Sequence, residues 1–173
     1  MSINIQKSQN KKDFAMAANL MACSEPWITL GMNEIECLKA FEGDFKEVYV
    51  LYVDENFAGF IILQTQGSFK GYIQTICIHP SFRGQGLGTK LINHCEKIIL
   101  AYSPNIFICV SSFNQKAYQL YTSLGFEKVG ELPNFVKDGF TEILLRKTMG
   151  PLDRKSTRLN SSHRCISYAV FCL

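Results

Sequence analysis

Two helices are expected near the start of the chain. The first, over 11–23, carries apolar side chains at helical spacing. It ends before Pro26, because proline disfavours helical geometry in the residue that precedes it. The second helix, over 33–40, starts at Asn33, whose side chain suits the N-cap position. The apolar positions are Phe14, Ala17, Ala18 and Met21 in the first helix and Ile35, Leu38 and Phe41 in the second.

A meander of strands is expected after these helices. Residues 47–53 are mostly β-branched or aromatic, which predicts a strand buried on both faces. Short turns separate it from two further strands at 58–64 and 72–78, so the three strands are expected to pair antiparallel. A short strand at 3–6 precedes the first helix.

Helices and strands alternate in the second half of the chain. A helix from the glycine-rich stretch 83–88 to about Tyr102 has Leu87, Leu91 and Cys95 on one face. The remaining elements are a strand at 106–110, a helix at 115–124 closed by Gly125 as a left-handed cap, and strands at 126–132 and 141–146. This order predicts an α+β fold, with a central, mostly antiparallel sheet of about seven strands flanked on both faces by four helices.

Length and charge divide the chain into one domain and a tail. The 173 residues suit a single domain, which we expect over 1–149. Lys and Arg equal Asp and Glu within 1–150, so the whole net charge of +3 comes from the Ser/Arg-rich stretch that follows. We interpret 150–173 as a non-native or disordered basic tail, which resembles translated vector sequence, with a genuine basic tail as the alternative. The balanced domain is not expected to bind nucleic acid or a membrane surface.

The seven cysteines favour a reducing compartment. None of them forms a CxxC pair, and several lie in apolar runs, where a thiol behaves as a small hydrophobe. Their spread supplies no clustered zinc ligands, so no metal is expected. The N-terminus has no apolar signal region, and no apolar run approaches the roughly 20 residues of a membrane span. We therefore expect a cytoplasmic protein.

The glycine-rich stretch is the strongest chemical signal. It lies between a predicted strand and the start of a helix, where free N–H groups and the helix dipole favour phosphate. The nucleotide P-loop pattern GxxxxGK[ST] fits nowhere, and the dinucleotide pattern GxGxxG fails because residue 89 is Thr89. The pattern [RQ]xxGx[GA] fits Arg83-Gly-Gln-Gly-Leu-Gly88 at every position. A glycine-rich turn that only caps a helix is the alternative without function.

Two motifs carry a resemblance to a known family. Residues 75–90 resemble motif A of the GNAT acyltransferases, and residues 112–126 resemble motif B, in the family's order and spacing. The resemblance covers roughly 1–149 and implies an acetyl-CoA-dependent N-acetyltransferase of the small bacterial type. Its expected partners are acetyl-CoA as cosubstrate and a primary-amine acceptor of unassigned identity, and a homodimer is left open.

The resemblance also implies roles for individual residues. The main chain of Ile76, Cys77 and Ile78 would bind the acyl carbonyl and pantetheine arm, and an N–H there would stabilise an oxyanion. The pyrophosphate would lie on the amides of Gly84, Gln85, Gly86, Leu87, Gly88 and Thr89, beside the charge of Arg83. Asn114 would bind the cofactor arm, with helix N-capping as the alternative. Tyr121 would protonate the departing thiolate as general acid, with a core aromatic as the alternative.

The acceptor side is left open by the sequence. Ribosomal-protein-alanine acetyltransferases carry a Glu where this chain has Cys109, so their general base and peptide substrate are in doubt here. A water chain, Glu34, Glu36 or Glu142 could serve instead. Trp27 is either a wall of the acceptor cleft or a plug between the first two helices. Direct attack in a ternary complex is the expected reaction, and the alternatives are a CoA-binding regulatory module and a toxin that acetylates aminoacyl-tRNA.

Overall fold

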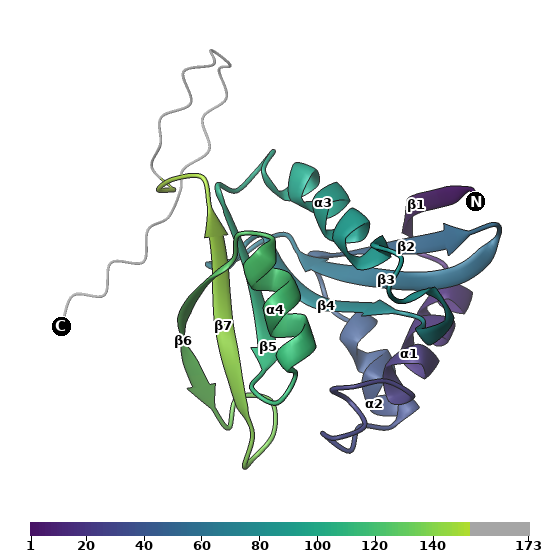
Figure 1. Ribbon diagram of the computed structural model, residues 1–173, viewed down its shortest axis with the longest axis horizontal. Helices are drawn as coiled ribbons and strands as arrows, with labels where there is room; N and C mark the ends of the chain where they lie inside the picture. The colour runs from purple at the N-terminus through teal and green to yellow at the C-terminus, as the bar shows by residue number, and fades with distance from the viewer. Residues whose placement is uncertain (153–173) are drawn as a thin grey trace.

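Seven strands and four α-helices make up the part of the chain that the computed structural model describes, residues 1–152 (Figure 1). The predicted tail at 150–173 lies outside the described residues from 153 onward. The helices are α1 (Lys11–Ala22), α2 (Glu34–Leu38), α3 (Leu87–Ile99) and α4 (Gln115–Ser123), with single 3₁₀ turns at Lys39–Phe41 and Pro80–Phe82. The strands are β1 (Ile3–Ser8), β2 (Lys46–Val53), β3 (Asn56–Gln64), β4 (Tyr72–Ile78), β5 (Asn105–Ser111), β6 (Glu127–Pro133) and β7 (Thr141–Thr148).

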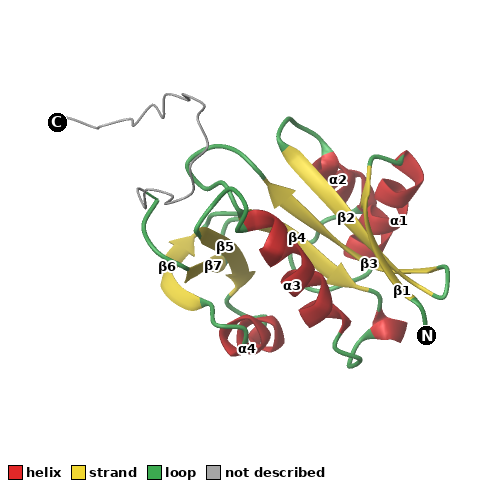
Figure 2. Cartoon of the chain, turned by 90° about the horizontal axis from the view of Figure 1, so that it is seen from above, coloured by secondary structure: helices red, strands yellow, loops and turns green. Residues whose placement is uncertain are grey.

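The strands form one mixed sheet in the order β1-β2-β3-β4-β5-β7-β6. Every neighbouring pair is antiparallel except β4 and β5, which are parallel. Helices α1 and α2 lie on one face of the sheet and α3 and α4 on the other (Figures 1 and 2). The predicted α+β fold, with its mostly antiparallel sheet and four helices, is therefore confirmed.

Strand β2 divides the interior into two cores, as its apolar sequence predicts. Val48 and Val50 face α1 and α2, whereas Tyr49 and Leu51 face α3. All four side chains are buried, because successive strand residues point to opposite faces and both faces here are covered. None of the helices in the described part of the chain has the length and apolar content that a membrane span requires.

Strands β4 and β5 separate soon after they meet. Only Tyr72 and Ile73 of β4 have register partners on β5, after which β5 continues its pairing with β7 alone. Gln74 is the extra residue of a bulge opposite β3, and its Nε2 donates to the carbonyl oxygen of Ala40 at 3.3 Å. A bulge bends the strand that contains it. The last part of β4 therefore leaves β5, and the two strands diverge in Figure 1.

Helix α2 begins at the predicted residue, but the face that it buries is not the predicted one. Asn33 and Glu36 form a reciprocal capping box, with Asn33 Oδ1 accepting from Glu36 N at 3.0 Å and Glu36 Oε2 accepting from Asn33 N at 2.8 Å. Ile35 is 74% exposed, so the predicted apolar face is wrong, and Cys37 is the helix residue that enters the core. Trp27, in the preceding connector, is half-buried against the same core, which favours the plug interpretation.

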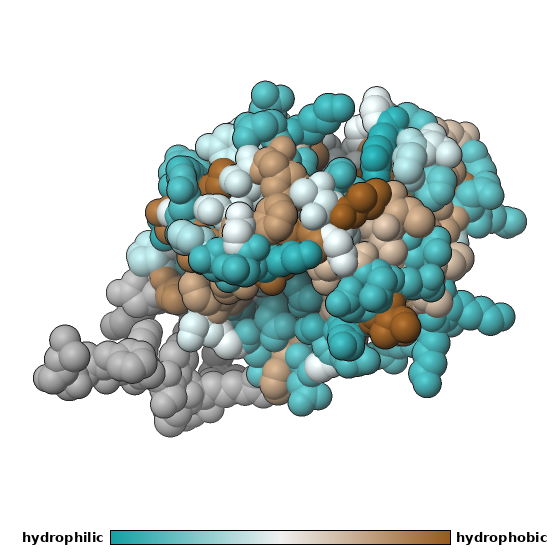
Figure 3. All heavy atoms as spheres, turned by 90° about the horizontal axis from the view of Figure 1, so that it is seen from below, coloured by the Kyte–Doolittle hydropathy of each residue, from teal (hydrophilic) through white to brown (hydrophobic). Residues whose placement is uncertain are grey.

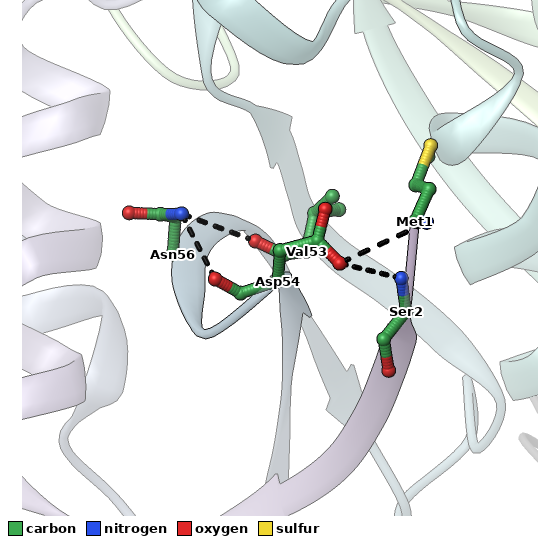
Figure 4. Close-up of polar contacts among 5 residues, drawn as sticks. All are labelled: Met1, Ser2, Val53, Asp54 and Asn56. Atoms are coloured by element: carbon green, nitrogen blue, oxygen red, sulfur yellow. Dashed lines mark hydrogen bonds and ion pairs between the residues drawn. The ribbon is translucent and has the colours of Figure 1, made fainter.

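The turn between β2 and β3 fixes the start of the chain. Asp54 Oδ1 accepts a hydrogen bond from Ser2 N at 2.6 Å, and Asn56 Nδ2 donates to the Asp54 carbonyl oxygen at 3.0 Å (Figure 4). These contacts hold edge strand β1 against β2 at its first residue.

Exposed hydrophobic side chains occur on the loops around the sheet. Phe135 and Val136, in the β6–β7 loop, are among them. On the face drawn in Figure 3, hydrophobic residues are scattered among hydrophilic ones. Such scattering is ordinary for a protein surface.

Candidate active site

A cleft of about 820 Å³ opens where β4 leaves β5. Its walls are the end of β4, the loop and first turn of α3, and the start of α4. Eleven of the twelve residues that the sequence singled out line it, all except Gln85: Ile76, Cys77, Ile78, Arg83, Gly84, Gly86, Leu87, Gly88, Thr89, Asn114 and Tyr121. Gln85 instead points away, and its Nε2 donates to the carbonyl oxygen of Ser81 at 3.4 Å. The structure thus brings two distant sequence motifs to one cavity.

Helix α3 presents uncapped N–H groups to this cleft. Its N-cap is Gly86, which has no side chain to accept from the first turn. The first internal bond runs from Lys90 N to the Gly86 carbonyl oxygen at 3.1 Å. The N–H groups of Leu87, Gly88 and Thr89 therefore have no acceptor within their helix. Together with the positive end of the helix dipole, they can bind an anion.

The glycines keep the space before the helix open. Gly84 and Gly86 have φ angles of +75° and +71°, a region that favours glycine, and a Cβ on either would meet no atom within 4 Å. Gly88 differs, because a Cβ there would stand 3.7 Å from Ile78 Cγ1 and 3.8 Å from Leu120 Cδ2, two residues that line the cleft. The backbone at 84–88 can therefore be approached closely by a ligand such as a pyrophosphate.

Arg83 lies at the cleft, but its guanidinium is already engaged. Its Nε donates to the carbonyl oxygen of Ile78 at 2.8 Å, and its Nη2 donates to the buried hydroxyl of Ser24 at 3.1 Å. Arg83 therefore ties the free end of β4 to the segment that follows α1. The predicted charge is present at the glycine-rich loop, but two of the five N–H donors of Arg83 hold the strand in place.

We expect Arg83→Met to lower the free energy of unfolding by about 1–3 kcal/mol, because it leaves the Ser24 hydroxyl and the Ile78 carbonyl without their donor while keeping much of the stem. Denaturant unfolding of the purified variant would measure this change. Unaltered stability combined with weakened anion binding would instead assign the side chain to the ligand alone.

The end of β4 offers backbone groups and a thiol. Residues 76–78 pair with β3 on one edge, and no register partner on β5 faces the other edge. Burial raises the pKa of the Cys77 thiol, and the nearby Ser24 and Arg83 partly oppose this shift. Cys77 is therefore held as a neutral thiol, which does not suit it to act as a nucleophile.

Asn114 caps α4 and also lines the cleft. Its Oδ1 accepts from Ala117 N at 3.3 Å, so the capping interpretation is correct. Its Nδ2 donates to no other described residue, which leaves an amide N–H pair at the cleft wall. The capping role of Asn114 Oδ1 therefore leaves its Nδ2 group free for the predicted role in binding the cofactor arm, which stays a prediction.

Tyr121 is buried at the inner wall of the cleft, and 7% of it is exposed. Its ring lies 6.2 Å from that of Phe126, so it is also a core aromatic. Burial raises the pKa of its hydroxyl above the ordinary 10.0, and the Cys77 thiol adds to the shift. The Tyr121 hydroxyl is therefore protonated at neutral pH, and its pKa lies further above that of a free thiol than the pKa of an exposed tyrosine does.

The three candidate general bases differ in their exposure and in their hydrogen bonds. Glu34 and Glu36 are exposed, and Glu36 is occupied by the capping box of α2. Glu142, on β7, is 5% exposed and accepts a hydrogen bond from Ser111 Oγ at 2.6 Å. The cleft also includes Glu25, which lies in no motif of the sequence, and Phe113 and Lys116, which lie within the motif B stretch but were given no role there. No group of three or more metal-ligating side chains occurs within residues 1–152.

Comparison with known proteins agrees with this geometry. Residues 14–126 match the model of the acetyltransferase (GNAT) family. A thialysine N-epsilon-acetyltransferase of Mus musculus is 31% identical over 80 residues, which cover 46% of this chain and 47% of that protein. An N-alpha-acetyltransferase of Sulfurisphaera tokodaii is 27% identical over 118 residues, covering 61% and 69%. The chain thus spans less than half the length of the mouse protein.

A solved structure shares the fold. An aminoglycoside 6'-N-acetyltransferase complexed with coenzyme A superposes with a TM-score of 0.66 at 20% identity, over 87% of this chain and 98% of that one.

Proposed function

The chain belongs to the acetyltransferase (GNAT) family, and from that premise we propose that it transfers the acetyl group of acetyl-CoA to a primary amine. The observation that carries this proposal is the cleft itself. It joins three uncapped N–H groups of α3 to the unpaired edge of β4 and to the Tyr121 hydroxyl. Groups suited to binding a phosphate, binding an extended arm and donating a proton thus line a single cavity, which supports a CoA thioester as the ligand.

Each part of the cleft has a role in this proposal. The amides from Gly84 to Thr89 bind the pyrophosphate, and the main chain of 76–78 binds the pantetheine arm and the acetyl carbonyl. The Asn114 Nδ2 group donates to the arm. Acetyl-CoA, as cosubstrate, supplies a thioester whose carbonyl carbon is the electrophile. A metal is not part of the proposal.

The reaction needs three proton transfers. The acceptor ammonium first loses a proton, because only the free amine has a lone pair for attack. The C–N bond then forms, and an N–H of the β4 edge stabilises the oxyanion. The C–S bond breaks as the intermediate collapses, and Tyr121 donates its hydroxyl proton to the leaving thiolate. Tyr121 recovers that proton from the nitrogen of the new amide through solvent, which balances the step.

A thiol-release assay tests the proposal. Purified protein with acetyl-CoA should release CoA when incubated with a member of a panel of amino acids, polyamines, aminoglycosides and peptides with free N-termini. Mass spectrometry should show that the acceptor gains one acetyl group. Tight binding of acetyl-CoA without turnover on any amine would contradict the proposal and favour a CoA-binding regulatory module.

We also propose a reducing, cytoplasmic environment. The cysteines of residues 1–152 are all free thiols, and Cys37, Cys77 and Cys95 are buried as small apolar groups. These thiols are compatible with that compartment. A homodimer stays an open possibility of assembly.

A further inference from the structure

Two buried carboxylates, Asp13 and Glu142, have no counter-ion within the described residues, but Asp13 accepts hydrogen bonds from two hydroxyls, those of Ser8 and Tyr52. Glu142 is 5% exposed, yet it belongs to none of the four ion pairs of residues 1–152. Its Oε1 accepts from Ser111 Oγ at 2.6 Å, and this neutral hydroxyl is its single hydrogen-bond donor there. A buried carboxylate without a cation is costly in a protein interior. Its presence is therefore better explained by a role in function than by a contribution to stability.

Glu142 stands at the end of the sheet where the cleft opens. It is the register partner of Ser111, the last residue of β5, and the next turn leads to Asn114 at the cleft wall. The adjoining backbone is fixed, because Ser112 N donates to the Thr141 carbonyl oxygen at 2.9 Å. The carboxylate is therefore attached to rigid strands, and its partner Ser111 lies four residues before the first residue of α4, the helix that carries Tyr121.

The strand faces decide from which side Glu142 is reached. Ile143 and Leu145 pack into the core under α3 and α4. Glu142 alternates with them, so it points to the opposite face, as does Cys109. Helices α1 and α2 cover that face over β2, β3 and β4, on the other side of the gap between β4 and β5. An acceptor can approach there while the acetyl donor occupies the cleft on the helix α3 side.

Tyr72 connects this face to the acid. Its hydroxyl interacts electrostatically with Cys109, with Glu142 and with Tyr121. The Tyr72 side chain therefore interacts with the proposed acid, Tyr121, and also with Glu142. The titratable groups that interact with Glu142 are thus the Tyr72 hydroxyl and the Cys109 thiol, and burial raises the pKa of each, which keeps both neutral. No cation from β4, β5 or α4 neutralises the carboxylate in the described part of the chain.

The second carboxylate oxygen is open to a ligand. Glu142 Oε2 accepts from no described side chain. Tyr102 Oη is the single fully buried side-chain polar atom without a partner among residues 1–152, so Glu142 Oε2 keeps some contact with solvent. One oxygen is thus held by Ser111, and the other retains a small exposure to solvent, although Glu142 is not among the residues that line the cleft.

We propose that Glu142 binds the ammonium group of the acceptor and takes its proton before the amine attacks the thioester. The N–H bond of the ammonium breaks, its proton moves to Glu142 Oε2, and the lone pair left on nitrogen forms the C–N bond. The carboxyl then releases the proton to solvent. The inference rests on the proposed function, and it supplies from β7 the carboxylate that Cys109 does not provide on β5.

Glu142→Gln tests this role with little change of shape. The amide keeps an oxygen for Ser111 but has neither charge nor basicity. We expect kcat/KM for the amine to fall by about 10²–10⁴-fold at neutral pH, the usual cost of a lost base. The dissociation constant of acetyl-CoA should stay within twofold. Glu127→Gln, an exposed carboxyl on β6, is the matched control and should leave kcat/KM unaltered.

The pH dependence gives a second readout. Burial raises the pKa of Glu142 above its ordinary 4.5, although the Ser111 hydrogen bond partly offsets the shift. A carboxyl whose pKa is raised by folding contributes its full stability below pH 4.5, and this contribution is lost as the pH rises through the pKa of the folded state. Glu142→Gln should therefore melt at a higher temperature than the unsubstituted protein, by a margin that grows as pH rises above 4.5. If Glu142→Gln melted at the same temperature as the unsubstituted protein at neutral pH, or at a lower one, the description of Glu142 as an unpaired, buried carboxylate would be contradicted.

A titration that needs no turnover separates this inference from the proposed function. The carboxyl carbon of Glu142 can be followed by ¹³C NMR in CoA-saturated protein and identified by its loss in Glu142→Gln. n-Butylammonium should lower its pKa, because an opposite charge favours the carboxylate. n-Butanol, of similar shape but neutral, should not. An unaltered pKa with both, or a kcat/KM of Glu142→Gln within threefold of the unsubstituted protein, would overturn the inference even where turnover exists.

Discussion

Gly86→Asp is expected to abolish acetyl-CoA binding while the protein still folds. A side chain at residue 86 meets no protein atom within 4 Å, so it enters the open space before the uncapped N–H groups of α3. Asp is also a favourable N-cap residue, which limits the cost of its φ of +71°. Like charges about 4 Å apart repel by about 4 kcal/mol at an effective dielectric of 20, which corresponds to roughly 10³-fold in affinity.

Calorimetry with acetyl-CoA measures this effect, and two variants isolate its cause. Gly86→Asn has nearly the same shape without charge, so it should lose much less affinity than Gly86→Asp. Gly67→Asp introduces the same residue at a φ of +88°, also into open space but in the β3–β4 turn, and should leave affinity intact. Near-native binding by Gly86→Asp would refute the phosphate site at α3.

Tyr121→Phe is expected to reduce the rate of acetyl transfer by about 10²–10⁴-fold, the usual effect of losing an acid catalyst. The substitution removes only the hydroxyl and keeps the ring packing against Phe126. The raised pKa of Tyr121 reduces its driving force for proton donation, which favours the lower end of that range. It also means that activity should not fall through ionisation of this group below about pH 10. Acetyl-CoA affinity should change little, because the hydroxyl acts as the thiolate forms.

Single-turnover rates and cofactor affinity for the same variant test this assignment. Tyr118→Phe offers a matched control, since Tyr118 lies on the same helix and does not line the cleft. Its rate should equal that of the unsubstituted protein. If Tyr121→Phe turns over within about threefold of normal and only Tyr121→Ala is damaged, Tyr121 is a core residue and not the acid.

Much of the fold follows from local patterns in the sequence. Strand β2 was predictable because its unbroken β-branched and aromatic run requires cover on both faces, and Val48 and Tyr49 are indeed buried in separate cores. The first residue of α3 was less certain, but the glycines marked where a helix begins after a strand. These features depend on neighbouring residues, which the sequence places together.

Features that depend on distant residues were not predictable. Nothing in the sequence indicates that Gln74 forms a bulge, because the bulge exists only relative to β3. Helix α2 buries Cys37 and exposes Ile35, since the direction of so short a helix is set by α1 and the sheet. The engagement of Arg83 by Ser24, 59 positions away, was equally hidden. Glu142 appeared as one of three equivalent acids until burial separated it from the others.

The narrow junction between β4 and β5 separates two units of the sheet, although one hydrophobic core continues across it. The β1–β4 meander and the β5–β7–β6 group each have continuous pairing, but two register pairs join them across the sheet. Amide hydrogens near this junction should exchange through local opening, at a lower free energy than those in the middle of β2 or β7. A ligand in the cleft contacts both units at once, so it should slow this exchange on both sides of the junction.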